Sequence, residues 1–455
     1  MVTIGSDTQP GTILTVESAT SVGANIGAPG VPVILGQADL SNGNASANTA
    51  SRITRPKQAR SEFGAPADSL LTQAIQDALV EGAYPVYAIA PEEKSVTGED
   101  LSGNSGQTAT LANSPVIERT DAVTFTVNST TKTTVFYYEG DPANATPGTD
   151  EVYLNPVTGK FKVDESMGSA GDSVDYEYAD YTNTFDEVTD ASAFGGSYLR
   201  EVADFMAVVS EEDSVVSSAK DKSASMESNG WFNIALCGAG DPWIDDQATS
   251  TDELTGSYSH SYDTSRLQLV HPSRSKEGDT LIGAYAGRRS DAGIDRSPIF
   301  DRLKTHTDML DNLNDAQIEK LIGENVIPIE ERSGGARIID DVTTVSDSNT
   351  DESAWRDGFS RLVTDFVAET VDEQSEPFIG EFNRDPVLNA LRGQVESELK
   401  ALLDSAAIEA YSLVVSSVDS QTASVDVGIN TSDPLRNIEV TVAAGEVLNA
   451  VSTEG

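Results

Sequence analysis

The sequence is poor in the residues that most enzymes and metal proteins use for chemistry. Among 455 residues, Cys237 is the only cysteine, and the histidines are His260, His271 and His306. One cysteine excludes an intrachain disulfide and a thiolate metal cluster, and the three histidines have no metal-ligand spacing such as H-x-x-x-H. Cys237 follows the apolar run WFNIAL, which favours a buried structural cysteine. A catalytic pairing of Cys237 with His271 is the alternative.

Basic residues are also scarce. The chain has 29 Lys and Arg, only 11 of them Lys, against 74 Asp and Glu, which gives a formal net charge of −45. Nucleic-acid binding needs basic side chains along the phosphates, and an anionic membrane surface would repel this chain, so both partners are excluded. A lysine-poor acidic surface is typical of proteins adapted to molar salt, where screening shortens charge repulsion to about 3 Å. We therefore expect a halophilic source, with an ordinary acidic protein as the alternative.

Long apolar runs and nucleotide-binding motifs are absent from the sequence. No run approaches the ~18 residues that span a bilayer, and the start MVTIGSDTQPGTI lacks the features of a signal peptide. The segment Cys237–Asp241 lacks the spacing of a phosphate loop. Asp340–Asp341 and Asp347–Glu352 lack the calcium-loop pattern and are typical of a solvated surface. We expect a soluble protein that is not an enzyme and has no catalytic, cofactor-binding or metal-binding residues.

The apolar pattern indicates an α/β chain of about three domains. Val31–Leu35 and Tyr84–Ala90 are typical of strands buried on both faces, and Leu70–Leu79 has helical spacing that ends at Gly82. We predict an N-terminal arm over residues 1–20 and an α/β core over residues 21–104 and 190–330.

Residues 105–189 differ from the core because they show short alternating strands and turn residues without a helical period. We predict an inserted all-β domain here, preceded by a polar linker at 101–114. After it, apolar residues from Phe194 to Val209 predict an amphipathic helix. Strands follow at Trp231–Leu236 and Leu267–Val270.

The remaining core and the C-terminal domain, residues 331–455, combine helices with β-structure. We predict helices opening at Leu281–Gly287, capped at Asn314 or Asp315, and running from Trp355 to Val367 and from Asp385 to Ala410. Short strands are predicted at Val326–Ile329 and Ala336–Ile339, and a hairpin at 411–429.

Both ends of the chain carry short apolar strands without an evident local partner. One solution is exchange, in which these strands complete the sheet of another subunit at the edge of the 411–429 hairpin; pairing within the subunit is the alternative. Arg288–Arg289 similarly pairs either inside the subunit or with an acidic patch on a neighbour. The candidate linking strands are Thr12, Ile13, Leu14, Thr15, Val16 and Ile438, Glu439, Val440, Thr441, Val442, and the candidate receiving residues are Leu413, Val414, Val415, Val425, Val427 and Ile429.

Several segments, in their order along the chain, resemble contractile tail sheath proteins of tailed viruses and related injection systems. The resemblance covers most of the chain outside 105–189. The N-terminal arm departs from the family in lacking the usual Pro-Gly-Val-Tyr motif. The segments are Pro10–Thr12, Val33–Ala38, Ser61–Gly64, Glu81–Tyr87, Ser265–Pro272, Gly283–Gly287, Ser297–Pro298, Gln317–Ile329, Gly335–Ile338, Thr343–Thr344, Trp355–Arg356, Arg361 and Phe382–Asn383.

The resemblance implies a structural subunit that polymerises as stacked hexameric rings around a tail tube and contracts to drive the tube through a host envelope. It implies an α/β sheath core, strand-exchanging termini, and 105–189 facing outward. The implied partners are further copies of the chain, the tail tube protein, and baseplate and tail terminator proteins. The implied location is the virion tail, assembled in the host cytoplasm. Arg392 and Lys400 would lie on a helix toward the tube. Alternatives are another acidic self-assembling surface or fibre protein, or a soluble halophilic enzyme.

Overall fold

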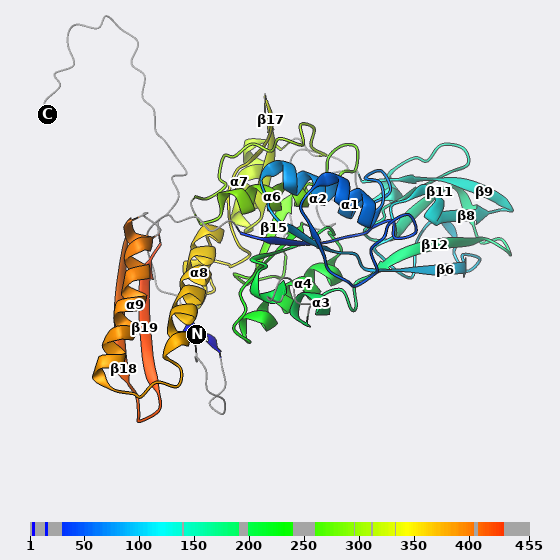
Figure 1. The fold of residues 1–455 in the computed structure, drawn as a ribbon. Helices are drawn as coiled ribbons and strands as arrows, with labels where there is room; N and C mark the ends of the chain where they lie inside the picture. The colour runs from blue at the N-terminus through cyan, green and yellow to red at the C-terminus, as the bar shows by residue number, and fades with distance from the viewer. Residues whose placement is uncertain are drawn as a thin grey trace, which may run out of the picture.

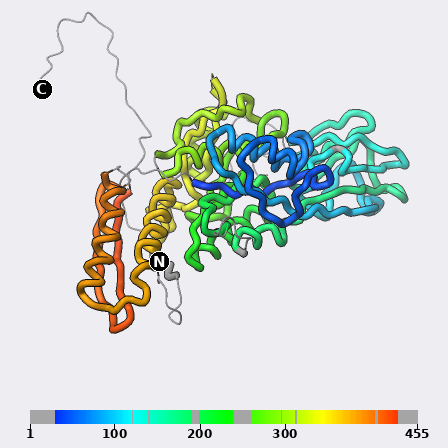
Figure 2. Tube along the Cα trace, in the orientation of Figure 1, coloured from blue at the N-terminus to red at the C-terminus, as the bar shows by residue number. Residues whose placement is uncertain are grey.

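Three parts lie side by side in the computed structural model of the chain: an α/β body, a second sheet on one side, and a helix–hairpin unit on the other (Figures 1 and 2). The structure describes residues 2–4, 14–16, 30–138, 141–190, 199–239, 260–294, 296–310, 313–332, 334–404 and 408–431.

The body is built on an eight-stranded sheet with the order β17-β16-β15-β14-β13-β3-β5-β4. Its inner strands are parallel, and an antiparallel strand closes each end. The inner strands β3, β5, β13, β14 and β15 are buried along their whole length, as expected for a parallel sheet covered on both faces. The strands are β3 (Pro32–Leu35), β4 (Ser51–Ile53), β5 (Val86–Ile89), β13 (Phe205–Val208), β14 (Ile234–Gly238), β15 (Leu267–His271), β16 (Ile327–Arg332) and β17 (Gly335–Ile338).

Helices cover one face of this sheet, and helices together with the second sheet cover the other. The first face holds α1 (Pro56–Phe63), α2 (Leu70–Glu81), α6 (Ile282–Ala292) and α8 (Gly358–Ser375); the second holds α4 (Asp213–Glu227) and α7 (Asp315–Gly323). Helices α2 and α6 pack backbone to backbone, since a Cβ at Gly283 would lie 2.2 Å from the Ala74 carbonyl oxygen. The helix expected from Leu281 and the cap at Asn314 are both confirmed.

The amphipathic helix predicted up to Val209 is wrong where the structure describes it. Phe205–Val208 forms β13, the strand between β3 and β14, and all four side chains are buried. The apolar spacing that suggested one face of a helix is instead a continuous run that fills both faces of a sheet. Residues 191–198 lie outside the described residues.

Between β5 and β13 the chain forms a seven-stranded sheet with the order β6-β12-β8-β9-β10-β11-β7. The sheet starts at Glu92, ahead of the expected boundary at 105. The linker predicted at 101–114 is wrong, because β7 lies inside that segment. Outside this sheet, α3 (Asp186–Asp190) leads back to the body. The strands are β6 (Glu92–Asp100), β7 (Gly106–Thr110), β8 (Val123–Val127), β9 (Thr130–Phe136), β10 (Glu151–Leu154), β11 (Lys160–Met167) and β12 (Ser173–Asp180).

The seven-stranded sheet shares its core with the body. One continuous apolar cluster contains Phe125 and Phe161 of this sheet and Met206 and Leu269 of the body. A buried ion cluster crosses the same junction, because Arg274 contacts Glu118 at 2.8 Å and Glu211 at 3.0 Å. These contacts fix the second sheet against the body.

The helix–hairpin unit follows α8 and lies at the end of the molecule opposite the seven-stranded sheet (Figure 2). It consists of α9 (Asp385–Asp404), β18 (Ala410–Ser417) and β19 (Ala423–Asn430). The helix predicted to run to Ala410 ends before that residue, which begins β18. The predicted hairpin is confirmed. At the other end of the chain, β1 (Val2–Ile4) pairs with β2 (Leu14–Val16), which lies beside α8 (Figure 1).

Candidate assembly surface

Cys237, His260 and His306 lie on different segments of the chain, and His271 lies in β15, next to the strand that holds Cys237. Cys237 is fully buried in β14, and burial raises the pKa of its thiol far above the usual range, so it stays protonated. His260 Nε2 lies 2.7 Å from the Glu324 carbonyl oxygen, and His306 Nε2 lies 3.0 Å from Asp77. Among the residues with described positions, no group of His, Cys, Asp and Glu could hold a metal ion, and no helix is long and apolar enough to cross a bilayer.

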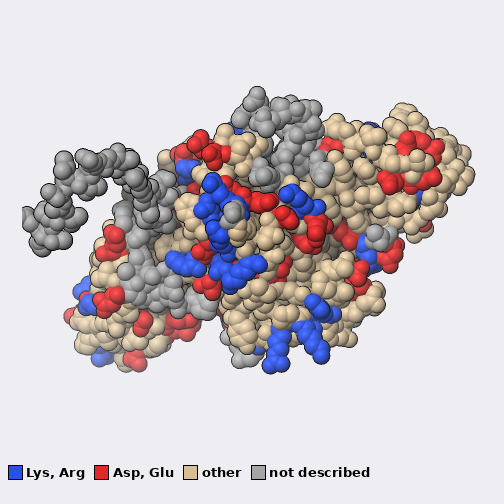
Figure 3. Space-filling view, turned by 90° about the horizontal axis from the view of Figure 1, so that it is seen from above, with Lys and Arg blue, Asp and Glu red and all other residues tan. Residues whose placement is uncertain are grey.

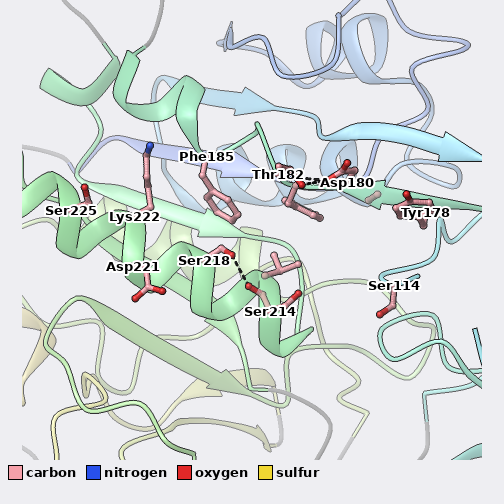
Figure 4. A pocket seen from close by; sticks show the side chains of 13 residues that line it. Ser114, Tyr178, Asp180, Thr182, Phe185, Ser214, Ser218, Asp221, Lys222 and Ser225 are labelled. Carbon is pink, nitrogen blue, oxygen red and sulfur yellow. Dashed lines mark hydrogen bonds between the residues drawn. The ribbon is translucent and has the colours of Figure 1, made fainter. Parts of the chain in front are cut away.

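A cavity of about 480 Å³ lies where the end of β12 meets α4 (Figure 4). Its charged side chains have partners within the chain: Lys222 contacts Asp186 at 2.9 Å, and Asp180 pairs with Lys94. Ser218 donates to the Ser214 carbonyl oxygen at 2.7 Å. These polar groups are therefore bonded to neighbours within α4, on α3 and on β6, and their side chains point in different directions (Figure 4).

Two charged pairs, Arg288–Arg289 and Asp340–Asp341, are buried. Arg288 contacts Glu81 at 2.8 Å, and Arg289 is fully buried with Asp341 at 3.7 Å, so the intramolecular alternative holds for Arg288–Arg289. Asp340 and Asp341 are buried too, which corrects their assignment to a solvated face. Asp341 accepts hydrogen bonds from Gln268 and Ser297 at 2.8 and 3.1 Å, which offset the cost of burying it.

The β18–β19 hairpin has one covered face and one open face. Along β18 exposure alternates, with Leu413 and Val415 packed toward α9 and Val414 exposed over 51% of its surface. Val425, Val427 and Ile429 of β19 pack on the same side as Leu413. A two-stranded hairpin is marginal alone, so α9 supplies the apolar support that lets it persist.

Both long edges of this hairpin are open among the described residues, because β18 and β19 pair only with each other. The Val418 N–H donates to the Thr422 carbonyl at 2.9 Å, which fixes which residue pairs exchange hydrogen bonds. Because antiparallel pairs alternate, Leu413 and Val415 on one edge and Val425 and Val427 on the other direct their N–H and C=O groups outward. The hairpin can therefore accept one further strand on each side.

Asn383, in the turn between α8 and α9, holds the tip of the hairpin. Its Nδ2 donates to Ser417 Oγ at 3.0 Å and to the carbonyls of Asp419 and Thr422 at 2.6 and 3.1 Å. At the other end, Thr431 Oγ1 donates to Ser360 Oγ of α8 at 3.0 Å. The sequence singles out Asn383 only through the resemblance to sheath proteins. Nothing in the local pattern predicts that its amide reaches residues 34 to 39 positions away.

Some of the remaining candidate residues belong to the described part of the chain, and the others lie outside it. Arg392 and Lys400 are exposed on α9, where Lys400 contacts Glu396 at 2.8 Å. Leu14–Val16 form β2, and its pairing with β1 corrects the expectation that this strand has no local partner. Thr12, Ile13 and Ile438–Val442 lie outside the described residues.

A group of carboxylates lies under α8, which leads into the helix–hairpin unit. Asp204, Asp365 and Glu369 line one small cavity there, and the Val31 N–H donates to Asp204 at 2.5 Å. Burial raises the pKa of Asp204 to about 6 and the pKa of Glu369 well above its usual range, with Asp204 and Asp365 adding to the latter. Ionised carboxylates are therefore disfavoured at this contact.

We expect Asp204→Asn to stabilise the protein at pH 8 and to change little below pH 5. A raised pKa in the folded state gives stability that is present at low pH and is lost as the pH rises through about 6. The asparagine keeps the acceptor for Val31 and removes the charge. Thermal unfolding at constant high salt should show a midpoint higher by roughly 1–3 °C at pH 8. The exposed Asp68→Asn provides the control; an equal gain in both variants, or a gain that is unchanged at pH 5, would contradict the assignment.

Comparison with known proteins finds no protein-family model and no curated sequence that matches the chain, but it finds solved structures with the same fold. One is titled the helical sheath of the anti-feeding prophage in its contracted state (TM-score 0.56, 11% identity, 97% of this chain and 100% of that chain). Another is the sheath complex of an extracellular contractile injection system, PVC, in the contracted state (0.56, 12%, 97% and 99%). A third is the sheath tail protein of Desulfitobacterium hafniense (0.52, 12%, 92% and 100%). The chain has the contractile-sheath fold along almost its whole length, as the resemblance in its sequence implied.

Proposed function

We propose that the chain is the structural subunit of a contractile sheath. The observation that carries the proposal is the similarity to sheath proteins over 97% of the chain. These neighbours are the helical sheath of the anti-feeding prophage and the sheath of a contractile injection system, each in its contracted state. The engaged histidines and the buried, protonated Cys237 accord with a structural role.

In this proposal the subunits form stacked hexameric rings around an inner tube, and linking strands hold the rings together. The strands Thr12–Val16 and Ile438–Val442 of neighbouring copies add to the two open edges of the β18–β19 hairpin, where Leu413–Val415 and Val425–Ile429 receive them. Backbone hydrogen bonds supply the affinity of such strand addition, and alternate side chains supply its register.

Contraction is then a change of packing between bodies that stay rigid. The shared apolar core and the Arg274 cluster hold the seven-stranded sheet to the body, so each subunit moves as one piece. The lattice has two arrangements of the same interfaces, and the linking strands keep it connected during the exchange. The free energy is stored during assembly, and no nucleotide or other cofactor takes part.

Further partners follow from the same proposal. The rings assemble in the host cytoplasm on a tail tube, with baseplate and tail terminator proteins at the two ends, and become part of a virus tail that drives its tube through the host envelope. Residues 105–189 face outward, and α9, with Arg392 and Lys400, lies toward the tube.

The test is electron microscopy of the purified chain at two salt concentrations. We expect hollow striated tubes in molar salt, because repulsion between copies of charge −45 then falls off within about 3 Å. At ~10 mM salt, where the screening length is about 30 Å, the tubes should dissociate. Tubes that persist at low salt would contradict the electrostatic part of the proposal, and a protein that stays monomeric in all conditions would contradict sheath assembly itself.

A further inference from the structure

Four exposed basic side chains stand together on this otherwise acidic molecule. Arg52 lies in the edge strand β4, Arg55 precedes α1, and Lys57 and Arg60 lie on α1. All four are exposed, and the segment 51–61, SRITRPKQARS, contains no acidic residue. We call these four side chains the β4–α1 basic patch.

The patch differs from most other basic groups of the body. Basic side chains gather over the body in several places when the molecule is seen from above, many with acidic side chains next to them (Figure 3). Arg296 contacts Asp301, and Arg332 and Arg337 contact Glu330. Within the part of the chain that the structure describes, the basic patch forms no ion pair; Arg60 donates to Gln76 at 3.3 Å.

The local fold accounts for only part of these charges. The first turn of α1 contains no acidic residue, and the side chain of the N-cap residue Arg55 makes no capping hydrogen bond. Positive charges at the start of a helix oppose its dipole, so Arg55 and Lys57 stand where α1 would favour the opposite sign. Arg52 has a local explanation, since a charged residue discourages unwanted pairing at an edge strand. Arg60 has another, since it lies in the last turn of α1, where the dipole favours a positive charge. Arg55 and Lys57 have no such explanation.

We propose that the β4–α1 basic patch binds a carboxylate-rich surface on a neighbouring copy of the chain. This inference rests on the proposed assembly. A neighbouring copy carries 74 acidic residues, most of which have no basic counterpart in a chain with only 29. Strand exchange already holds the copies together, so the patch acts at a high effective concentration and need not overcome the net repulsion alone. A free nucleic acid has no such tether and meets the full charge of −45.

Zero-length crosslinking tests the contact directly. Tubes are assembled from equal parts of unlabelled and ¹⁵N-labelled protein and treated with a carbodiimide, which joins an amine to a contacting carboxylate. Lys57 is the only lysine of the patch, and we expect its peptide joined to an acidic peptide of the other isotopic form. Lys57→Arg keeps the charge and should lose this crosslink, whereas Lys276, 3.4 Å from Glu331, should crosslink within one subunit. Tubes in which Lys57 crosslinks only within its own subunit would overturn the proposal.

A matched pair of variants separates the patch from net charge. One variant replaces Arg52, Arg55, Lys57 and Arg60 with Gln; the other replaces Lys94, Lys276, Arg296 and Arg332, each ion-paired within the subunit. Both change the net charge from −45 to −49. We expect the patch variant to fold and to raise the critical concentration for assembly about tenfold more than the control at ~0.1 M salt, with the difference shrinking at 1 M as screening shortens from about 10 Å to 3 Å.

The outcomes distinguish this inference from the proposed function. Wild-type protein that fails to assemble would overturn both. Wild-type tubes together with equal shifts in the two variants would overturn only the role of the patch. Loss of binding to a labelled DNA duplex in the patch variant, with unchanged assembly, would assign the patch to nucleic acid and overturn the proposal as well.

Discussion

Arg266→Met is expected to lower the free energy of unfolding by roughly 3–5 kcal/mol, because it leaves two buried carboxylates without their main counterion. The Arg266 guanidinium contacts Asp365 at 2.5 and 2.9 Å and Glu227 at 2.6 Å, and its side chain is 1% exposed. Arg361 contacts the same two carboxylates, with Asp365 at 2.8 Å. The cluster joins α4 and α8 to Arg266, the residue before β15, so its loss weakens the contact between the body and the helix that leads into the hairpin unit.

The measurement is the thermal midpoint at constant high salt, with a second substitution to identify the cause. Lys276→Met removes an exposed pair with Glu331 and should cost about 1 kcal/mol or less. Adding Glu227→Gln to Arg266→Met should recover part of the loss, since Arg361 then pairs with Asp365 and no buried carboxylate is left over. If this double variant is less stable than Arg266→Met alone, lost packing and not uncompensated charge explains the effect.

Much of the body could be predicted from the sequence because its strands and helices follow local rules. The continuous apolar run at Val31–Leu35 is sufficient to indicate a strand buried on both faces, and β3 is that strand. Asn314 is a strong capping residue, and the structure shows a complete capping box with Gln317. The hairpin at 411–429 has alternating apolar residues around a polar turn, a pattern that needs no tertiary information.

The errors occur where tertiary structure decides between two local readings. Phe205–Val208 fits a helix face as well as a buried strand, and only its place between β3 and β14 settles which. The charge of Asp341 predicts a surface position, but Asp341 and Arg289 are buried beside each other because Gln268 and the carbonyl oxygens of Gly293 and Gly358 complete their hydrogen bonds. Gln268 and Gly358 lie about 70 positions from the groups they bond, a distance that a single sequence does not bridge.

The candidate assembly surface was likewise predictable from the sequence only in part. The hairpin and its apolar residues follow from alternation along the chain. The support by α9, the anchoring by Asn383, and the direction of the outward N–H groups require the register, which only the structure supplies. Because the register shows which N–H groups point outward, single substitutions at the hairpin edges can test strand exchange.

Val415→Pro and Val427→Pro are each expected to abolish tube formation while leaving a folded monomer. Proline lacks an N–H, and at these two positions the N–H points to the open edge, away from the partner strand of the hairpin. Proline is tolerated at such edge positions, so the hairpin itself should survive. Each variant removes one donor that an incoming strand needs and places a ring in its path. Electron microscopy in molar salt reports the tubes, and circular dichroism reports the fold.

Val415→Ala and Val427→Ala are the matched controls, because they remove more of the packing against α9 than proline does but keep the edge N–H. We expect both alanine variants to form tubes, with at most a modest increase in critical concentration. Val414→Pro gives the opposite comparison: its N–H points to β19, so this variant should unfold the hairpin and lower the thermal midpoint. If proline at 415 or 427 is no worse for assembly than alanine at the same position, that edge receives no strand. If this holds at both positions, the copies are held together by contacts other than strand exchange.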